Sequence, residues 1–111
     1  MGVAYEILVA PAAEREIRKL RPKQQTRILD QIEALRTEPR PRGVEKLSQN
    51  PRFWRIRAGD YRVIYFIDDQ KRLTIVLVVR HRKDAYRNLE QLNPQIVAAT
   101  LAQLASVHLR V

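Results

Sequence analysis

Residues 73–79 read Leu-Thr-Ile-Val-Leu-Val-Val, a nearly continuous apolar run, and no other feature restricts the fold as much. The run is far shorter than the ~20 residues of a membrane-spanning helix. Its β-branched residues favour a strand. Because successive side chains of a strand point to opposite faces, a strand that is apolar at almost every position needs cover on both faces. The sequence therefore predicts a central strand over residues 73–79.

Two further strands precede this run, and tight turns separate all three. Phe53–Arg57 is followed by a turn at residues 58–60 and a second strand over Tyr61–Ile67. Asp68–Lys71 form the next turn, and strands this close in sequence pair antiparallel. Alternation divides the first of these strands into two faces, with Trp54 and Ile56 on one and Phe53, Arg55 and Arg57 on the other.

The first third of the chain predicts a short strand and two helices. Ala4–Val9 is rich in β-prone residues, and Pro11 then opens a helix, since proline fits the first helical position. Pro22 ends that helix, and a second helix follows over Lys23–Thr37. Two helices joined so tightly form an antiparallel hairpin. The second helix has apolar residues at the spacing of one core-facing stripe: Ile28, Leu29, Ile32 and Leu35.

The other segments complete the expected order. Glu38–Arg52 predicts a basic loop that Leu47 anchors in the core, and Arg82–Leu92 predicts a short polar helix or turn. Gln95–Val107 predicts a last helix. The order β-α-α-β-β-β-α gives an α+β fold in which a helical hairpin packs on a small antiparallel sheet, with an extra C-terminal helix. We expect one domain over residues 1–87, with residues 88–111 as a helical extension packed on it.

The charge balance points to an anionic partner. The chain has 21 Lys and Arg against 12 Asp and Glu, a net charge of +9 among 111 residues. Such an excess favours nucleic acid, an acidic protein or an anionic surface. The chain has no cysteine, so thiolate chemistry, disulfides and cysteine-based metal sites are excluded. The first ten residues do not resemble a signal peptide, and we expect a cytoplasmic protein that does not bind membranes.

Three segments carry a resemblance to a known family: residues 53–57 (Phe-Trp-Arg-Ile-Arg), 59–65 (Gly-Asp-Tyr-Arg-Val-Ile-Tyr) and 79–87 (Val-Arg-His-Arg-Lys-Asp-Ala-Tyr-Arg). With the element order, they resemble the RelE/ParE superfamily of bacterial type II toxin–antitoxin systems over about residues 3–87. In that superfamily the RelE branch cuts mRNA in the ribosomal A site without a metal. The ParE branch poisons DNA gyrase and usually lacks the catalytic residues.

The resemblance favours the RelE branch and implies a metal-free, ribosome-dependent mRNA endonuclease that inhibits translation. It implies no cofactor, and its partners are mRNA, ribosomal RNA and a cognate RelB-like antitoxin that is acidic or has an amphipathic helix. The assembly expected is a dimer or a toxin–antitoxin hetero-oligomer. Two alternatives remain open: a gyrase inhibitor of the ParE type, and a toxin-fold protein that only binds RNA or its antitoxin.

The resemblance also implies a set of site residues. Arginine suits phosphate binding because its planar guanidinium donates two parallel hydrogen bonds, but it rarely gives up its proton. The family therefore places arginines around the scissile phosphate and a tyrosine, and in some relatives a histidine, near the nucleotide. The implied catalytic residues are Arg55, Arg57, Arg62, Arg80, Tyr86 and His81. Further RNA contacts are expected from Lys46, Arg52, Arg82 and Lys83.

Each of these residues also has a structural interpretation. Arg55 and Arg57 suit the solvated face of an edge strand, and Arg62 suits an ion pair with Asp60 or Asp84. The position of Arg80 shifts to Arg82 if the alignment slips. Tyr86 suits packing of the tail on the sheet. His81 has the one nearby side chain with an ordinary pKa near neutrality, but strand alternation puts it opposite Arg80.

Overall fold

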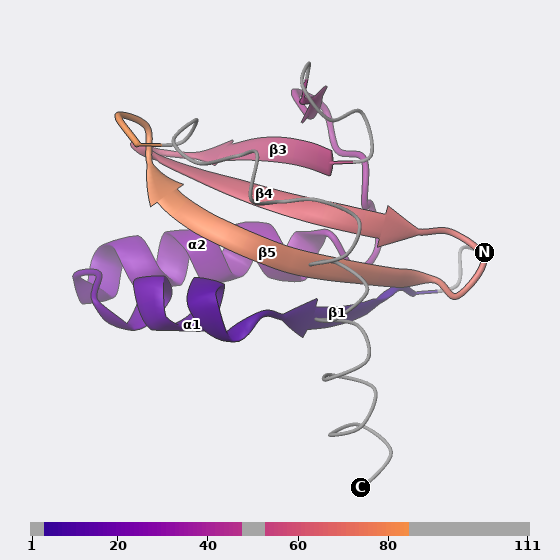
Figure 1. Ribbon diagram of the computed structural model, residues 1–111, viewed down its shortest axis with the longest axis horizontal. Helices are drawn as coiled ribbons and strands as arrows, with labels where there is room; N and C mark the ends of the chain where they lie inside the picture. The colour runs from indigo at the N-terminus through magenta and orange to yellow at the C-terminus, as the bar shows by residue number, and fades with distance from the viewer. Residues whose placement is uncertain (1–3, 48–52, 85–111) are drawn as a thin grey trace, which may run out of the picture.

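The computed structural model describes residues 4–47 and 53–84, which form two helices and a five-stranded sheet (Figure 1). The predicted α+β class and the helical hairpin on one sheet are confirmed. The predicted last helix, 95–107, and the extension 88–111 lie outside the described residues. The elements are β1 (Glu6–Val9), α1 (Pro11–Arg18), α2 (Pro22–Ala34), β2 (Glu45–Lys46), β3 (Phe53–Ala58), β4 (Tyr61–Asp68) and β5 (Leu73–His81).

The sheet has the strand order β1-β5-β4-β3-β2, so β5 lies between two neighbours, as its apolar run predicts. β2 to β5 pair antiparallel, but β1 pairs parallel with β5, from Glu6 opposite Leu73 to Val9 opposite Val76. The predicted small antiparallel sheet is confirmed for β2 to β5, and the parallel β1 makes the whole sheet mixed. After β1, the chain passes through the helical hairpin and the antiparallel strands and comes back beside β1. There β5 runs in the same direction as β1.

Both helices lie on one face of the sheet and supply its core (Figure 1). Each begins with a proline, α1 at Pro11 and α2 at Pro22. The predicted stripe of α2 is confirmed at Ile28, Ile32 and Leu35, which are buried. Leu29 is an exception because it is 47 % exposed: one residue turns a helix by about 100°, which carries Leu29 off the stripe. No helix among the described residues is long and apolar enough to cross a membrane.

The two faces of the sheet carry different residues. Under the helices lie Val63, Tyr65, Val76 and Val79 from β4 and β5, and we call this the helix-covered face. The opposite face carries a second apolar cluster that includes Phe53, Ile64, Ile75, Leu77 and Val78. Leu47 is buried in the second cluster, so its predicted role as an anchor is confirmed. Thus β5 is covered on both faces.

A β-bulge in β5 changes which side chains reach the opposite face. Tyr65 pairs with Val76, but the preceding residue of β4, Ile64, pairs with Val78, so Leu77 is the extra residue. Beyond the bulge, Arg62 therefore lies opposite Arg80. Without the extra residue, Arg62 would face Val79 and Arg80 would point to the helix-covered face. Bulges are common beside active sites because they redirect side chains in this way.

Candidate functional site

Three arginines lie side by side across three neighbouring strands on the opposite face of the sheet. Arg57 of β3 pairs with Arg62 of β4, and Arg62 pairs with Arg80 of β5. Directly paired residues have Cβ atoms about 5 Å apart and point to the same face. We call these three residues the arginine row. Like charges so placed repel one another, and an anion bound between them would relieve that repulsion.

Arg62, the middle residue of the row, is surrounded mainly by positive charges and carbonyl oxygens. Its Nη1 donates hydrogen bonds to the carbonyl oxygens of Gly59, at 3.1 Å, and Tyr61, at 3.0 Å. Burial lowers the pKa of Arg62, and the positive charges of Arg57, Arg55 and Arg82 lower it further, against a weaker opposing effect of Asp60. Among the ion pairs of residues 4–47 and 53–84, none joins Arg62 to Asp60 or Asp84, the alternative that the sequence suggested. Asp60 instead contacts Arg82, at 3.9 Å.

Arg55 lies two residues before Arg57 on the same face, but it has a partner. The guanidinium of Arg55 forms an ion pair with the carboxylate of Glu45. Arg55 is only 7 % exposed. Glu45 belongs to β2, a two-residue strand within the segment predicted as a loop, and it pairs directly with Arg55. Sequence reasoning missed Glu45. A carboxylate two residues before the Leu47 anchor was the available signal, but only the pairing of β2 with β3 places it on the arginine-bearing face.

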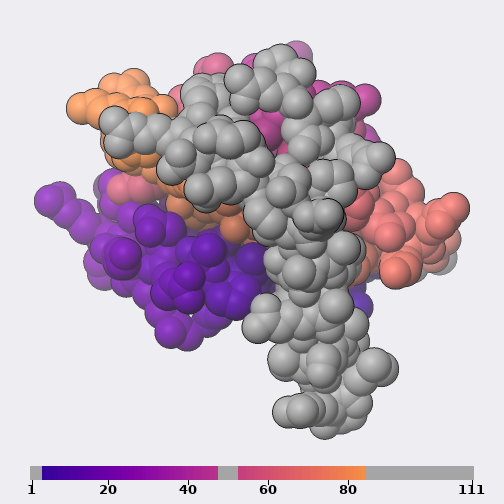
Figure 2. Space-filling view, in the orientation of Figure 1, coloured from indigo at the N-terminus to yellow at the C-terminus, as the bar shows by residue number. Residues whose placement is uncertain are grey.

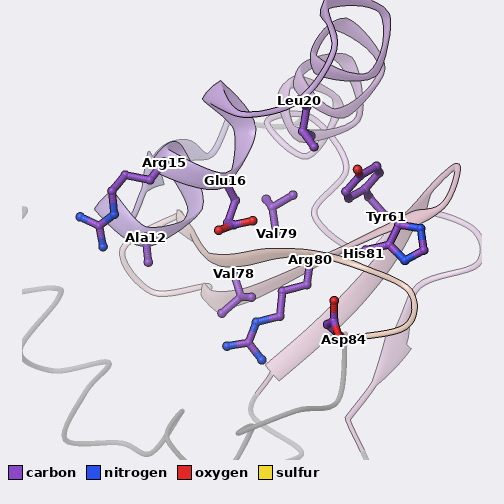
Figure 3. A pocket seen from close by; sticks show the side chains of 10 residues that line it. All are labelled: Ala12, Arg15, Glu16, Leu20, Tyr61, Val78, Val79, Arg80, His81 and Asp84. Carbon is purple, nitrogen blue, oxygen red and sulfur yellow. The ribbon is translucent and has the colours of Figure 1, made fainter.

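His81 is not part of the arginine row. Its ring packs edge to face on Tyr61, with ring centroids 5.4 Å apart, and these two residues pair on the helix-covered face. Its Nδ1 accepts a hydrogen bond from the backbone N–H of Lys83, at 3.2 Å. Figure 3 shows His81 beside Tyr61 at one end of a pocket of about 440 Å³ between α1 and β5, with the Arg80 side chain directed away from that pair.

The expected RNA-binding residues are dispersed. Lys46 pairs with Trp54 on the helix-covered face, and its Nζ lies 5.1 Å from the centroid of that ring. Arg82 and Lys83 lie in the turn after β5, at the end of the sheet that carries the arginine row. Arg52 and Tyr86 fall outside the described residues, so their roles stay predictions from the resemblance.

A second charged cluster lies at the other end of β4 and is internally neutralised. Arg40 donates from Nη2 and Nη1 to the two carboxylate oxygens of Asp69, at 2.7 and 3.1 Å. The hydroxyl of Tyr5 donates to Asp69 at 2.6 Å. These hydrogen bonds lower the pKa of Asp69 from 3.8 to about 2. Arg40 also stacks 5.1 Å from the centroid of the Trp54 ring. This cluster holds the loop after α2 on the sheet.

Comparison with known proteins yields one family and a set of solved relatives. The model of the ParE toxin of type II toxin–antitoxin systems matches residues 7–86. The RelE1 protein of Methanocaldococcus jannaschii is 27 % identical over 77 residues, which cover 67 % of this chain and 86 % of that protein.

Two solved structures share the fold over most of the described residues. The RelE–RelB complex of Pyrococcus horikoshii has a chain with a TM-score of 0.65 and 28 % identity, covering 74 % of this chain and 99 % of that one. The toxin–antitoxin complex RelBE2 of Mycobacterium tuberculosis also has a TM-score of 0.65, at 29 % identity, covering 72 % of this chain and 100 % of that one. Both similar structures are complexes of toxins with their antitoxins.

Proposed function

This chain belongs to the ParE toxin family of type II toxin–antitoxin systems. We propose that it is a member of the RelE-type branch, whose toxins cleave RNA. The proposed activity is ribosome-dependent cleavage of mRNA, without a metal, in the cytoplasm. Its consequence in the cell is arrest of translation. A RelB-type antitoxin is the proposed neutralising partner, because the similar structures from Pyrococcus horikoshii and Mycobacterium tuberculosis are toxin–antitoxin complexes.

The arginine row is the observation that carries this proposal. Cleavage by the substrate's own 2′-hydroxyl places extra negative charge on a five-coordinate phosphorus in the transition state. Guanidinium groups carried on three neighbouring strands match that charge, and preorganised donors are the largest single source of catalysis in many enzymes. The lowered pKa of Arg62, caused by burial and by the charges of Arg57, Arg55 and Arg82, shows that other positive charges surround this residue before any RNA binds.

Glu45 supplies the proton acceptor that arginines cannot be. In the proposed step, the 2′-hydroxyl loses its proton to the Glu45 carboxylate and the 2′ oxygen forms a bond to phosphorus. The bond from phosphorus to the 5′ oxygen breaks, that oxygen takes a proton from water, and Glu45 returns its proton to the solvent. The products are a 2′,3′-cyclic phosphate and a 5′-hydroxyl. The ion pair with Arg55 holds Glu45 on the same face as the arginine row.

Tyr86 keeps the role that the resemblance implies, which is to stack on or orient the nucleotide. His81 is left out of the proposed proton transfers because its ring lies with Tyr61 on the helix-covered face. Lys46, Arg52, Arg82 and Lys83 stay proposed contacts to the RNA backbone. A dimer or a hetero-oligomer with the antitoxin stays the proposed assembly.

The test is cleavage of an mRNA on purified ribosomes, with the new ends mapped and their chemistry identified. We expect cuts within the ribosomal A site that leave a cyclic phosphate and a 5′-hydroxyl. Lys71→Gln is the matched control for a variant of the arginine row such as Arg62→Gln. It also removes one positive charge, but at the turn between β4 and β5. Intact mRNA with the wild-type protein, together with arrested replication in cells, would overturn the proposal.

The ParE match keeps gyrase inhibition as a second candidate, because the family model that fits residues 7–86 is the ParE model. A gyrase inhibitor needs a complementary surface but no arrangement of catalytic residues. It predicts a DNA damage response on expression and inhibited supercoiling in the presence of purified gyrase. It also predicts that growth arrest survives Arg62→Gln when the fold is kept.

A further inference from the structure

Gly59, in the turn between β3 and β4, is approached by an arginine from the helical layer. A Cβ placed on Gly59 would lie 3.2 Å from Nη1, 3.4 Å from Cζ and 3.6 Å from Nε of Arg27. Because these three distances are similar, the guanidinium of Arg27 lies flat over the glycine. The φ of Gly59 is +63°, which also favours glycine. Two features therefore favour glycine at residue 59: its positive φ and the close approach of the Arg27 guanidinium.

The same glycine also receives Arg62. Arg62 Nη1 donates to the Gly59 carbonyl oxygen at 3.1 Å, while Arg27 covers the Cα of that residue. Two guanidinium groups, one from α2 and one from β4, therefore meet at a single residue. Arg27 extends the positive charge of the arginine row around the end of the sheet and onto the helical layer.

The charge of Arg27 is not matched by a carboxylate. Among residues 4–47 and 53–84, Arg27 has no acidic group within ion-pair distance. Asp60 is the acidic residue of this turn, and it is engaged by Arg82 through both its carboxylate, at 3.9 Å, and its carbonyl oxygen, which accepts from the Arg82 N–H at 2.7 Å. An exposed arginine that packs over a turn, beside Arg62, suits an anionic ligand.

A hollow beside Arg27 has room for such a ligand. It measures about 190 Å³, and it is lined by Gln24, Arg27, Ala58, Gly59, Asp60 and Tyr61. The guanidinium of Arg27 and the amide of Gln24 are donors there. The Asp60 carboxylate also lines the hollow, but its charge is opposed by that of Arg82.

We infer that Arg27 and the Gly59 turn form a second phosphate subsite, which binds the RNA backbone next to the phosphate held by the arginine row. This inference rests on the proposed function, since it takes the ligand of the row to be RNA. The subsite holds a phosphate that does not react, so it contributes equally to substrate and transition state. Its loss raises KM and leaves kcat unchanged.

The test measures binding of a short single-stranded RNA with 2′-O-methyl riboses, which cannot be cleaved, over a range of salt concentrations. Each phosphate contact to a single strand contributes about 0.7 to the slope of log affinity against log salt. Arg27→Gln should lower that slope by about 0.7 and weaken binding about fivefold at roughly 0.1 M salt, for any RNA sequence. Arg27→Lys should restore most of the binding, and Lys71→Gln should leave it unchanged.

The outcomes separate this inference from the proposed function. Binding by Arg27→Gln that equals the wild type, while Arg62→Gln binds weakly, overturns the subsite and leaves the proposed function standing. Equal weakening by Arg27→Gln and Lys71→Gln also overturns the subsite, because the effect is then one of net charge. Wild-type binding by both Arg27→Gln and Arg62→Gln overturns the subsite and the proposed function together. Thermal unfolding of each variant establishes that the fold is kept.

Discussion

Two arginines at the two ends of β4 have opposite surroundings. Arg40 reaches the end of β4 and binds both oxygens of Asp69, and this hydrogen bonding raises the pKa of Arg40. Arg62, near the start of β4, contacts carbonyl oxygens and lies between other arginines, and its pKa is lowered. Figure 2 shows the turn after β4, in salmon, and the residues that follow β5, in orange, on opposite sides of the molecule.

The difference separates an arginine whose charge is paired with a carboxylate from an arginine that is surrounded by other positive charges. At Arg40 the charge is satisfied within the chain, and the guanidinium also stacks on Trp54, so the group ties a loop to the sheet. At Arg62 burial and neighbouring positive charges lower the pKa, and the proposed anionic ligand would offset the repulsion between these charges. Perturbed ionisable groups of the second kind cluster at functional sites. Substitutions at the two ends should therefore change different properties.

The largest effect is expected from Arg62→Gln. Removing one preorganised donor to the developing charge should lower the rate of RNA cleavage by about 10²–10³-fold. The unfolding temperature should stay within about 3 °C of the wild type, because two hydrogen bonds are lost while repulsion within the row is relieved. Cleavage kinetics and calorimetry on the same preparation measure both quantities. A variant that still cleaves at the wild-type rate would remove the arginine row from the mechanism.

Glu45→Gln tests the proton acceptor on the same face. The amide keeps a hydrogen-bond acceptor for Arg55 but takes up no proton, so we expect the cleavage rate to fall about 100-fold. RNA binding should be unchanged or tighter, because a negative charge has been removed. The control is His81→Gln, which should cleave at nearly the wild-type rate. The reverse ranking of the two variants would reassign the proton transfer to the histidine.

Arg40→Gln should reverse the pattern seen for Arg62. It removes a partly exposed ion pair and the stacking on Trp54, which together stabilise the fold by about 1 kcal/mol. We expect a fall in unfolding temperature of about 4–8 °C, with RNA cleavage unchanged at a temperature where the variant is folded. Calorimetry measures the unfolding temperature and the ribosome assay measures cleavage. Loss of cleavage in a folded variant would show that the two ends of β4 are functionally connected.

The smallest expected effect is the dependence of the unfolding free energy on acid pH. Because the pKa of Asp69 is lowered from 3.8 to about 2, its contribution to stability is fully present above the ordinary value and is lost as the pH falls through about 2. The unfolding free energy should therefore decline between about pH 4 and pH 2. Asp69→Asn should flatten this part of the profile while leaving the profile above it unchanged. Matching acid profiles for the two proteins would contradict the assigned pKa.

Much of the fold could be predicted because its signals are local. Prolines mark the starts of α1 and α2, short turns force β3, β4 and β5 to pair antiparallel, and the apolar run of β5 requires cover on both faces. β2 was missed because two residues are too few for a pattern of period two. The parallel entry of β1 beside β5 was missed because no local signal records which edge of a sheet a distant strand joins.

The site divides in the same way. By itself the sequence placed Arg55 and Arg57 on one face of their strand and set His81 on the face opposite Arg80, because alternation follows from the strand alone. Only the tertiary structure decided that Arg80 joins Arg62, through the extra residue at Leu77, and that Glu45 reaches Arg55. It alone brought Arg27 of α2 to Gly59. These contacts depend on register and on packing between layers, where one residue of shift reverses a side chain.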